Sequence, residues 1–563
     1  MLILGINGWY TRSHDVSACL VKNGKILAMA EEERFIRQKY AFDKIPINAI
    51  SYCLKEAKVT PNDIDIVALG WNYKLMYELR GKKFNYTDDQ VLDIIFPSKY
   101  FRRKRKPKCV MVPHHLAHAA STFFTSGFNE ATILVVDGQG ENESTTIAYG
   151  KGNKIQILKS FPIKDSLGYF YESINKYIGF HYLDSGKTMG LAPYGRANIN
   201  FHNIQIDDRG YRVTLKKELQ YDSSHLDEQE ALVALWHKEL KKHVKSPNKV
   251  EYVFDKNSSR IKAQFDISQS YKDLAASAQS ALEKTIIHLV KIANKTTGVK
   301  DVCLSGGVAL NCVANGKLFQ NTPINNLFIF PSANDAGVSA GAALYAAALY
   351  DKDAKFAKMV HPYFGPEYTN KEIEKILKSR KIRYTKPKDV CRVAAKLLAE
   401  NKVIGWFQGR MEIGPRALGN RSILANPLIK SNWKRVNIIK GRELWRPLAP
   451  SILDEYKGEY FENAVYSPFM LTALQVRKEK RAVIPAIVHV DGSSRPQTVS
   501  KNVNRKFWSL ISHFHKLTGV PVVLNTSFNG PGEPIVCSPQ DAIAVFYNSG
   551  LDYLIIGNFI IRK

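Results

Sequence analysis

Residues 132–157 read TILVVDGQGENESTTIAYGKGNKIQI, a pattern in which three strand-like runs alternate with two polar turns. Runs of this kind bounded by Gly and Asn are typical of β-strands joined by tight turns. Residues 2–27, LILGINGWYTRSHDVSACLVKNGKIL, repeat the same order of runs and turns. We therefore predict two three-stranded meanders and, with the helical sequence between them, a duplicated α/β fold.

Two later segments extend the second copy. Residues 269–298 have apolar side chains at helical spacing and lead into an apolar run and a glycine turn at 302–307. A second glycine-bearing helix start lies at 332–337. The duplicated pattern resembles the actin/hexokinase/Hsp70 (ASKHA) superfamily. The resemblance implies that the first turns of the two halves face a nucleotide in a central cleft.

A charged segment with prolines at 362, 366 and 387 separates this region from the rest of the chain. Apolar runs at 403–407 and 522–524 predict strands of a second α/β domain. Residues 200–265 are polar and weakly patterned, so they receive no assignment. The predicted domains are residues 1–352 and 389–563, with a linker at 353–388.

The composition is that of an ordinary soluble protein, with 45% hydrophobic and 23% charged residues among 563. The first apolar run lacks a basic flank, and the longest one, at 336–349, is too short to span a bilayer. Seven cysteines without a CxxC pair argue against disulfides and thiolate metal sites. We expect a cytoplasmic protein that does not contact membranes.

Two histidines suggest a metal site. His114 and His118 are four residues apart, so on a helix they share one face. Asp137 ends an apolar strand and Asp335 lies at a glycine-rich turn, and either carboxylate can complete the site. Two His and two Asp suit Fe(II), Mn(II) or Zn(II). The alternative is a pair of core imidazoles at a helix end.

Several glycine turns are suited to phosphate binding, because glycine lets backbone N–H groups approach an anion closely. They contain Gly138, Gln139 and Gly140, then Gly306 and Gly307, and a third turn ends with Lys187, whose charge adds to the attraction. An ordinary structural turn is the alternative for each of them, so none identifies a nucleotide site by itself.

The C-terminal region carries polar loops rich in arginine, glycine and proline, at residues 414–421, 440–447, 491–497 and 524–529. An arginine next to Pro or Gly sits on a rigid loop, where its guanidinium makes bidentate contacts to phosphate or carboxylate. Asn525 and Ser527 follow an apolar run and are suited to hold a small polar group. Structural ion pairs are the alternative for the arginines.

Together these segments resemble the O-carbamoyltransferases of nodulation-factor and antibiotic biosynthesis (the NodU/CmcH/TobZ family). The resemblance covers nearly the whole chain. Its motifs are His14-Asp15, EERF at 32–35, HHLAHA at 114–119, KTMGLAPYG at 187–195, SGGVALN at 305–311 and the loops from 414 to 529.

The resemblance implies an ATP-dependent carbamoyltransferase with two active regions. A C-terminal YrdC-like domain binds carbamoyl phosphate and ATP, with Mg, and forms carbamoyl adenylate. The N-terminal domain, similar to the tRNA threonylcarbamoyl-transferase, holds the adenylate beside a metal and transfers the carbamoyl group. The implied metal ligands are His114, His118, Asp137 and Asp335. The implied adenylate residues are Gly138, Gly168, Gly307 and Asn311, and those for carbamoyl phosphate and ATP are Arg416, Lys440, Arg446, Arg495, Asn525 and Ser527.

The transfer step needs a base for the acceptor hydroxyl. His14 is the candidate, because the fold resemblance places the first turn near the cleft. The alternative is an imidazole that only orients another group.

The acceptor is suggested by charge alone. The net charge is +28, and RRKRKPK at 102–108 precedes the histidine helix. A basic surface attracts phosphate backbones, and phage members of the family carbamoylate DNA. We expect a 5-hydroxymethylcytosine-type base, preferably in single-stranded DNA, and a homodimer. The alternatives are a small-molecule hydroxyl (antibiotic, sugar or nodulation factor), tRNA threonylcarbamoyl transfer, and a non-catalytic nucleic-acid-binding protein; a merely solvated surface also explains the charge.

Overall fold

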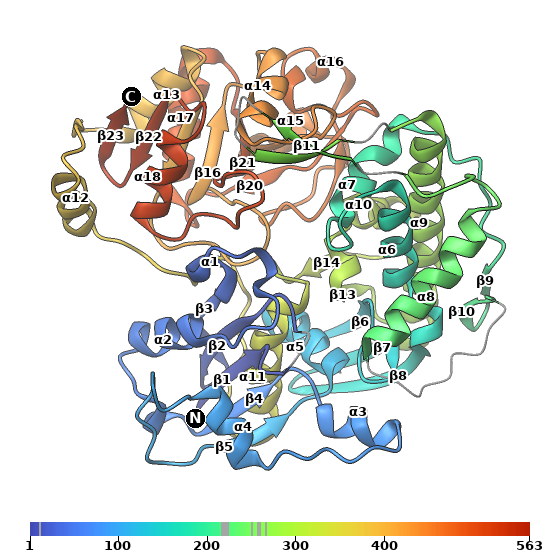
Figure 1. The fold of residues 1–563 in the computed structure, drawn as a ribbon. Coiled ribbons are helices and arrows are strands. Elements are labelled where there is room, and N and C mark those ends of the chain that lie inside the picture. The colour runs from blue at the N-terminus through green and yellow to red at the C-terminus, as the bar shows by residue number, and fades with distance from the viewer. Residues whose placement is uncertain (11–12, 216–224, 249–250, 256–259, 265–266) are drawn as a thin grey trace. The chain divides into compact units, whose positions relative to one another are not determined.

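The computed structural model describes residues 1–10, 13–215, 225–248, 251–255, 260–264 and 267–563 (Figure 1). The chain folds into two compact units. The first unit comprises Met1–Asn72, Phe84–Asn129 and Phe328–Lys563, and the second comprises Tyr73–Lys83 and Glu130–Leu327. Each unit is described by itself.

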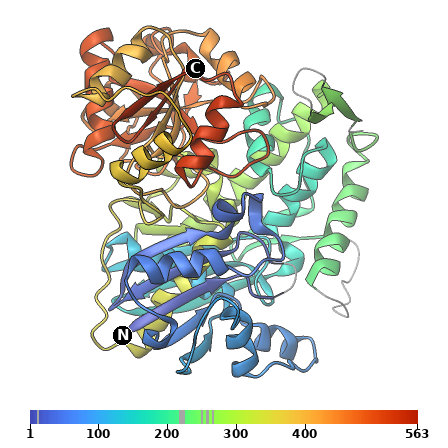
Figure 2. The same ribbon diagram turned by 60° about the vertical axis from the view of Figure 1, so that its left-hand side comes forward.

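The first predicted meander forms the start of a sheet in the first unit. β1 (Leu2–Asn7), β2 (Ser17–Lys22) and β3 (Lys25–Glu31) are antiparallel, as the runs and turns predicted. β4 (Ile66–Leu69) and β5 (Lys108–Met111) extend it in parallel, in the order β3-β2-β1-β4-β5. α2 (Ile47–Glu56) packs on β2 and β3 (Figure 2).

The second predicted meander has the same plan in the second unit. β6 (Glu130–Val136), β7 (Glu143–Lys151) and β8 (Lys154–Pro162) are antiparallel, and β13 (Asp301–Ser305) pairs with β6 in parallel. The strand order β14-β13-β6-β7-β8 repeats that of the first sheet, with β14 at Asn326–Ile329. The duplicated, ASKHA-like α/β fold is therefore confirmed.

Small residues let a helix of the first unit approach its neighbours closely. α11 (Val338–Tyr350) packs on β1 and on α5 (His114–Ser126). A Cβ atom at Gly5 would overlap the Ser339 carbonyl oxygen, and one at Gly341 would overlap that of Ala117. Gly341 therefore lets α11 approach α5, and Gly5 lets α11 approach β1.

Long helices cover the second unit. α9 (Gln269–Thr297) confirms the helical spacing predicted for residues 269–298. α6 (Leu167–Ile178) and α10 (Cys312–Asn321) each begin at a polar cap, Ser166 and Asn311, whose side chains accept from helix amides. The unassigned stretch 200–265 contains β9 (Ile204–Asp207), β10 (Gly210–Val213), α8 (His225–Leu240), β11 (Glu251–Asp255) and β12 (Arg260–Gln264), and the rest of it includes residues outside those described.

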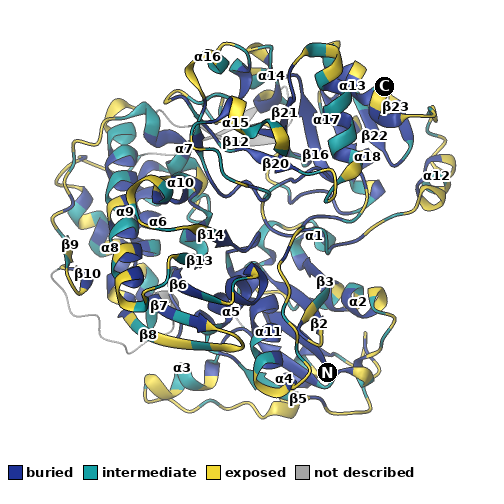
Figure 3. Cartoon of the chain, turned by 180° about the vertical axis from the view of Figure 1, so that it is seen from behind, coloured by how far each residue is buried: buried dark blue, intermediate teal, exposed yellow. Residues whose placement is uncertain are grey.

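A seven-stranded sheet organises the C-terminal region, in the order β20-β17-β21-β16-β15-β22-β23. The strands are β15 (Ile404–Phe407), β16 (Arg421–Ala425), β17 (Ala449–Leu453), β20 (Gln497–Val499), β21 (Val522–Ser527), β22 (Tyr553–Ile556) and β23 (Phe559–Arg562). The strands predicted near 403–407 and 522–524 are confirmed. Most strand residues are buried (Figure 3).

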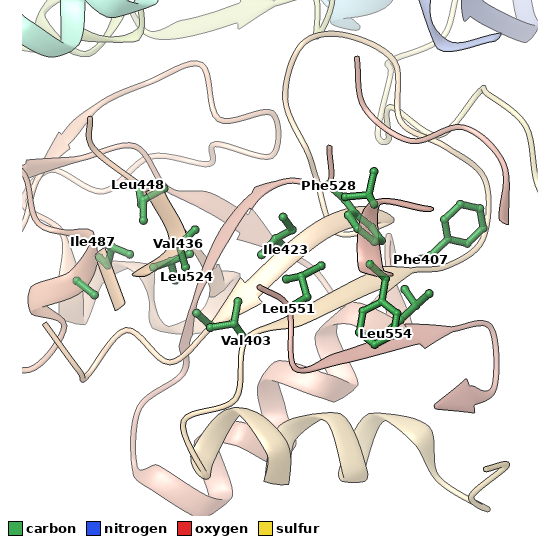
Figure 4. Close-up of a cluster of buried hydrophobic side chains, with 14 of the residues drawn as sticks. Val403, Phe407, Ile423, Val436, Leu448, Ile487, Leu524, Phe528, Leu551 and Leu554 are labelled. Atoms are coloured by element: carbon green, nitrogen blue, oxygen red, sulfur yellow. The ribbon is translucent and has the colours of Figure 1, made fainter. Parts of the chain in front are cut away.

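Alternating side chains of this sheet enter two separate cores, as the two-residue period of a strand requires. Leu524 and Phe407 point into the core drawn in Figure 4. Their neighbours Val523 and Trp406 enter the other core, which includes residues of α13 (Val390–Ala399) and α17 (Arg505–Thr518). The sheet is thus buried on both faces.

The predicted linker contains a helix, α12 (Asn370–Ser379). Its Ile373 and Leu377 are buried in the core of Figure 4. The two compact units do not coincide with the predicted domains. The bounds of those domains stay a prediction. Among the described residues no helix combines the length and the apolar character needed to cross a bilayer.

Candidate metal and activation sites

Two imidazoles and a carboxylate meet in the first unit. His114 and His118 lie on α5, and Asp335 begins the short helical turn Asp335–Gly337 that leads into α11. The two Nε2 atoms are 3.2 Å apart, and each is 3.7 Å from Asp335 Oδ1. All three residues are buried. The contact of α5 with α11 therefore brings together three predicted ligands.

The His114 ring is held in place by contacts to its Nδ1 atom and to its face. Its Nδ1 is 3.0 Å from the Gly70 carbonyl oxygen, and the Trp71 ring stacks on it at 3.8 Å between centroids. Because a carbonyl only accepts, Nδ1 carries the proton and the Nε2 lone pair faces His118 and Asp335. A backbone carbonyl behind an imidazole is a usual support of metal-binding histidines. Two imidazole nitrogens and a carboxylate oxygen fit a borderline divalent ion.

Asp137 lies in the second unit, at the turn after β6. Its Oδ1 accepts a hydrogen bond of 2.9 Å from the Gly307 amide. Ser166 Oγ donates to the Gly138 carbonyl at 2.6 Å, and a Cβ atom at Gly168 would lie 2.6 Å from the Gly138 amide nitrogen. The structure thus brings four predicted residues, Asp137, Gly138, Gly168 and Gly307, to one place.

The other residues predicted for the adenylate or for phosphate-binding turns have mostly structural contacts. Gln139 accepts from the Tyr169 hydroxyl at 2.6 Å, and Gly140 closes a turn onto Glu143. Asn311 caps α10 and exchanges hydrogen bonds with Gln279. Lys187 lies 3.2 Å from Asp184. Gly306 has φ of 89°, so it supports the turn through its backbone.

We expect Gly168→Ala to destabilise the protein by about 1–3 kcal/mol, the usual cost of overpacking. The added methyl would lie 2.6 Å from two backbone atoms, which cannot rotate away. Urea unfolding measures the loss. Gly186→Ala is the matched control, because a Cβ atom there meets nothing within 4 Å. Equal stabilities of the two variants would contradict the close approach.

Cationic side chains gather in the C-terminal region. Lys440 is buried, and its Nζ donates to Asn529 Oδ1 at 2.6 Å and to Ser527 Oγ at 3.1 Å. Burial lowers the pKa of Lys440 well below its ordinary value, and the charges of Arg442 and Arg446 lower it further. Burial also lowers the pKa of Arg442, with repulsion from Arg446, Arg495 and Arg416. We call Arg416, Lys440, Arg442, Arg446 and Arg495 the cationic cluster.

Two polar atoms beside these loops are unsatisfied. Arg495 Nε and Asn525 Oδ1 are buried without a hydrogen-bond partner among the described residues. The Asn525 amide nitrogen is fixed by Ala417 O and Ser451 Oγ at 3.1 and 2.9 Å, so the oxygen cannot exchange places with it. Buried polar groups in folded proteins are rarely left without a partner, so these two atoms are available to hydrogen-bond a ligand or an ordered water.

His14 lies on the loop between β1 and β2 and is half-buried. Its Nδ1 is 3.0 Å from Asp15 Oδ2, and Asn7 Nδ2 donates to the backbone carbonyls of His14 and Asp15, each at 3.1 Å. A carboxylate on one ring nitrogen orients an imidazole for proton transfer at the other. The geometry is compatible with a base, and the role stays a prediction.

Two family models match this chain. The one described as Carbamoyltransferase N-terminus matches residues 2–95 and 71–344, and the one described as Carbamoyltransferase C-terminus matches residues 395–563. The chain belongs to the carbamoyltransferase family. As a member it is a carbamoyltransferase enzyme, and both the paired histidines of α5 and the cationic cluster fall within the matched residues.

A curated relative of this carbamoyltransferase is the nodulation protein NolNO of Sinorhizobium fredii, 36% identical over 596 residues, covering 100% of this chain and 83% of that protein. Among solved structures, HypF of T. kodakarensis is 13% identical with a TM-score of 0.37, covering 63% of this chain and 48% of that chain. Sua5 of P. abyssi is 18% identical with a TM-score of 0.23, covering 30% and 46%. The structural likenesses concern the fold alone.

Sequence reasoning about the carbamoyltransferase missed Arg442. The residue stands in the quoted loop 440–447, but its place among four other cations depends on tertiary structure. The available signal was its position next to Gly441, whose φ of 57° lies in the left-handed region that favours glycine.

Proposed function

We propose that the chain is an ATP-dependent O-carbamoyltransferase that activates carbamoyl phosphate at the cationic cluster and transfers the carbamoyl group to a hydroxyl. The observation that carries this is the cluster itself, together with membership of the family. Two nearby carboxylates, Glu443 and Glu533, offset part of the repulsion among the five cations, and an anionic ligand offsets the rest. Carbamoyl phosphate and the ATP phosphates, with Mg, are such ligands.

The activation step consumes one water molecule. Water releases inorganic phosphate from carbamoyl phosphate, and the resulting carbamate oxygen attacks the α-phosphorus of ATP and displaces pyrophosphate. Arg446 and Arg495 hold the phosphate oxygens, and Lys440 with Ser527 positions the neighbouring group. Asn525 Oδ1, which lacks a donor, accepts a hydrogen bond from the carbamoyl NH2.

The transfer step belongs to the histidine cluster. His114, His118 and Asp335 hold a divalent ion, Fe(II) in our proposal. Asp137 is assigned as fourth ligand from the family motif. The bound ion supplies a Lewis acid that polarises the carbamoyl or phosphate oxygen. Gly138, Gly168, Gly307 and Asn311 hold the adenylate, assisted by Gln139, Gly140, Gly306 and Lys187.

His14 takes the proton. As the acceptor oxygen bonds to the carbamoyl carbon, its O–H proton passes to the imidazole, and the bond from that carbon to the AMP phosphate oxygen breaks. Asp15 stabilises the imidazolium that forms. The products are the O-carbamoyl ester and AMP.

A small-molecule hydroxyl is the proposed acceptor. The relatives give no support to a DNA acceptor, and the basic segment 102–108 is partly neutralised. Arg103 lies 2.6 Å from Asp93, Arg105 lies 3.2 Å from Asp65, and Lys106 pairs with Asp89. The net charge of +28 is the one observation that still favours DNA.

An acceptor panel tests the proposal. The enzyme is incubated with radiolabelled carbamoyl phosphate, ATP, Mg and Fe(II), and with a chitin oligosaccharide, an aminoglycoside or single-stranded DNA containing 5-hydroxymethylcytosine. We expect pyrophosphate release that depends on carbamoyl phosphate, and label on a small acceptor. Label on DNA alone would reverse the choice of acceptor. Threonine-dependent ATP consumption would instead indicate threonylcarbamoyl transfer.

A further inference from the structure

An unusual backbone loop follows α1 (Glu32–Ile36). Within residues 37–43, four non-glycine residues have positive φ: Arg37 at 57°, Tyr40 at 66°, Ala41 at 46° and Asp43 at 55°. L-residues avoid this region, and a non-glycine residue persists there only where its surroundings hold it. Strain of this kind concentrates at functional sites. We call residues 37–43 the strained loop.

One end of the strained loop holds the segment that carries His14. Asp15 donates its backbone N–H to Tyr40 O at 2.8 Å, and Asp43 donates its own to Ser13 O at 3.0 Å. Asp15 has a positive φ as well, 52°. The Phe42 ring meets the His14 imidazole edge to face, with centroids 6.3 Å apart. Backbone and ring contacts together therefore fix where the imidazole stands.

The other end is tied to the C-terminal region of the same unit. Arg37 donates from Nη1 to Ile535 O at 2.6 Å and from Nη2 to Pro534 O at 2.8 Å. These carbonyls follow Asn529, which accepts from Lys440 and donates to Glu533 O. The charge of Lys39 is a further, smaller cause of the lowered pKa of Lys440, after burial and the two arginines.

Helix α1 adds a second tie just before the strained loop. Arg34 donates to Gly414 O at 2.8 Å, and Glu31 Oε1 accepts from the Gly414 amide at 2.6 Å. Gly414 begins the loop that carries Arg416 of the cationic cluster. The segment from Glu31 to Asp43 therefore touches the surroundings of the cationic cluster at one end and the His14 loop at the other.

We propose that the strained loop is a positioning element for transfer, in which Arg37 anchors the loop to the activation region and Phe42 sets the His14 imidazole. The inference rests on the proposed function, with His14 as the base. Loosening the loop slows the attack on the adenylate and leaves adenylate formation intact. The two partial reactions therefore separate this role from a general loss of structure.

The first test compares Arg37→Gln with Arg410→Gln. Arg410 is the matched control, because it also ties the N-terminal region to the C-terminal region, through Tyr52 Oη on α2 at 3.0 Å and Leu27 O on β3 at 3.4 Å, without touching the strained loop. Activation is read as pyrophosphate–ATP exchange that depends on carbamoyl phosphate. Transfer is read as single-turnover decay of enzyme-bound carbamoyl adenylate, with water as the probe acceptor.

We expect Arg37→Gln to slow the decay about tenfold, as for loss of a positioning contact, while exchange stays at the level of wild type and of Arg410→Gln. Decay as fast as in wild type would overturn the inference alone. Absence of exchange in the wild-type enzyme would overturn the proposed function, and the inference with it.

The second test removes strain without removing a contact group. Ala41→Gly makes the positive φ favourable and widens the range of backbone conformations. Lys58→Gly does the same at a helix end, where φ is 56°. We expect slower adenylate decay in Ala41→Gly only, with exchange retained in both. Slower decay accompanied by lost exchange and a lower melting temperature would indicate a damaged fold and overturn the positioning role.

Discussion

Replacing both His114 and His118 by alanine is expected to remove the bound metal and to lower carbamoyl transfer about a thousandfold. A Lewis acid contributes several kcal/mol of transition-state stabilisation, and each ~1.4 kcal/mol is a factor of ten in rate. The two imidazoles supply two of the three ligand atoms that the first unit brings together. Pyrophosphate–ATP exchange is expected to continue, because the cationic cluster lies on other loops.

Metal analysis of the purified protein checks the first part, and exchange with single-turnover decay checks the second. His513→Ala is the matched control, because His513 Nε2 lies 3.3 Å from Asp389 Oδ2 and so forms another His–Asp pair of the chain. Full metal occupancy in the double variant would show that the ligands lie elsewhere. Loss of exchange along with transfer would show that the variant is damaged more widely.

The meanders could be predicted because their signal is local. Apolar runs and Gly/Asn turns at 2–27 and 132–157 specify strand, turn and strand within a few residues. The helical spacing of residues 269–298 is local in the same sense, and α9 bears it out. The weak pattern at 200–265 carries short strands whose pairing depends on partners, such as β9 with β10, that spacing does not reveal.

Only the pairing of the two histidines in the cluster could be predicted from local sequence; their approach to Asp335 could not. The i, i+4 spacing places His114 and His118 on one face of a helix, which is local information. Their distance of 3.7 Å from Asp335 depends on α11 lying against α5, and Gly341, which has no side chain, permits that close approach. The sequence around a glycine in a helix of small residues does not indicate which neighbouring element will pack against it.

Ion pairs within the basic segment weaken the charge argument for a DNA acceptor, which stays a prediction. The run RRKRKPK at 102–108 counts as a basic patch when only the chain is known. In the structure, α4 (Asp88–Ile95) places Asp89 and Asp93 beside Lys106 and Arg103. The converse holds for Arg442, which spacing did not single out and which tertiary structure places among other cations.

Arg446→Ala and Arg495→Ala are each expected to lower carbamoyl phosphate-dependent ATP turnover about ten- to a hundredfold. A charged hydrogen bond lost at a buried oxyanion is worth ~1.5–3 kcal/mol. Turnover is measured as AMP release at saturating ATP while carbamoyl phosphate is varied. Arg435→Ala removes the same charge from the same region, but its guanidinium is paired with Asp552 at 2.7 Å, so turnover should be retained.

The stability of these variants distinguishes a ligand site from structural ion pairs. If the arginines stabilised the fold through carboxylates, each alanine variant would unfold at a lower temperature, as Arg435→Ala should. In a cluster whose members repel one another, removing one arginine should instead keep or raise the melting temperature of the ligand-free protein. Arg446 is among the charges that depress the pKa of Lys440 and Arg442, so its removal raises both values and relieves the ligand-free protein. This relief opposes the loss of the 3.7 Å ion pair between Arg446 and Glu443, a partly exposed pair worth only ~0.2–1 kcal/mol. We therefore expect Arg446→Ala to melt no lower than wild type without ligands, and to be stabilised less than wild type by carbamoyl phosphate and ATP. Equal ligand stabilisation of the two proteins would place the anion site elsewhere.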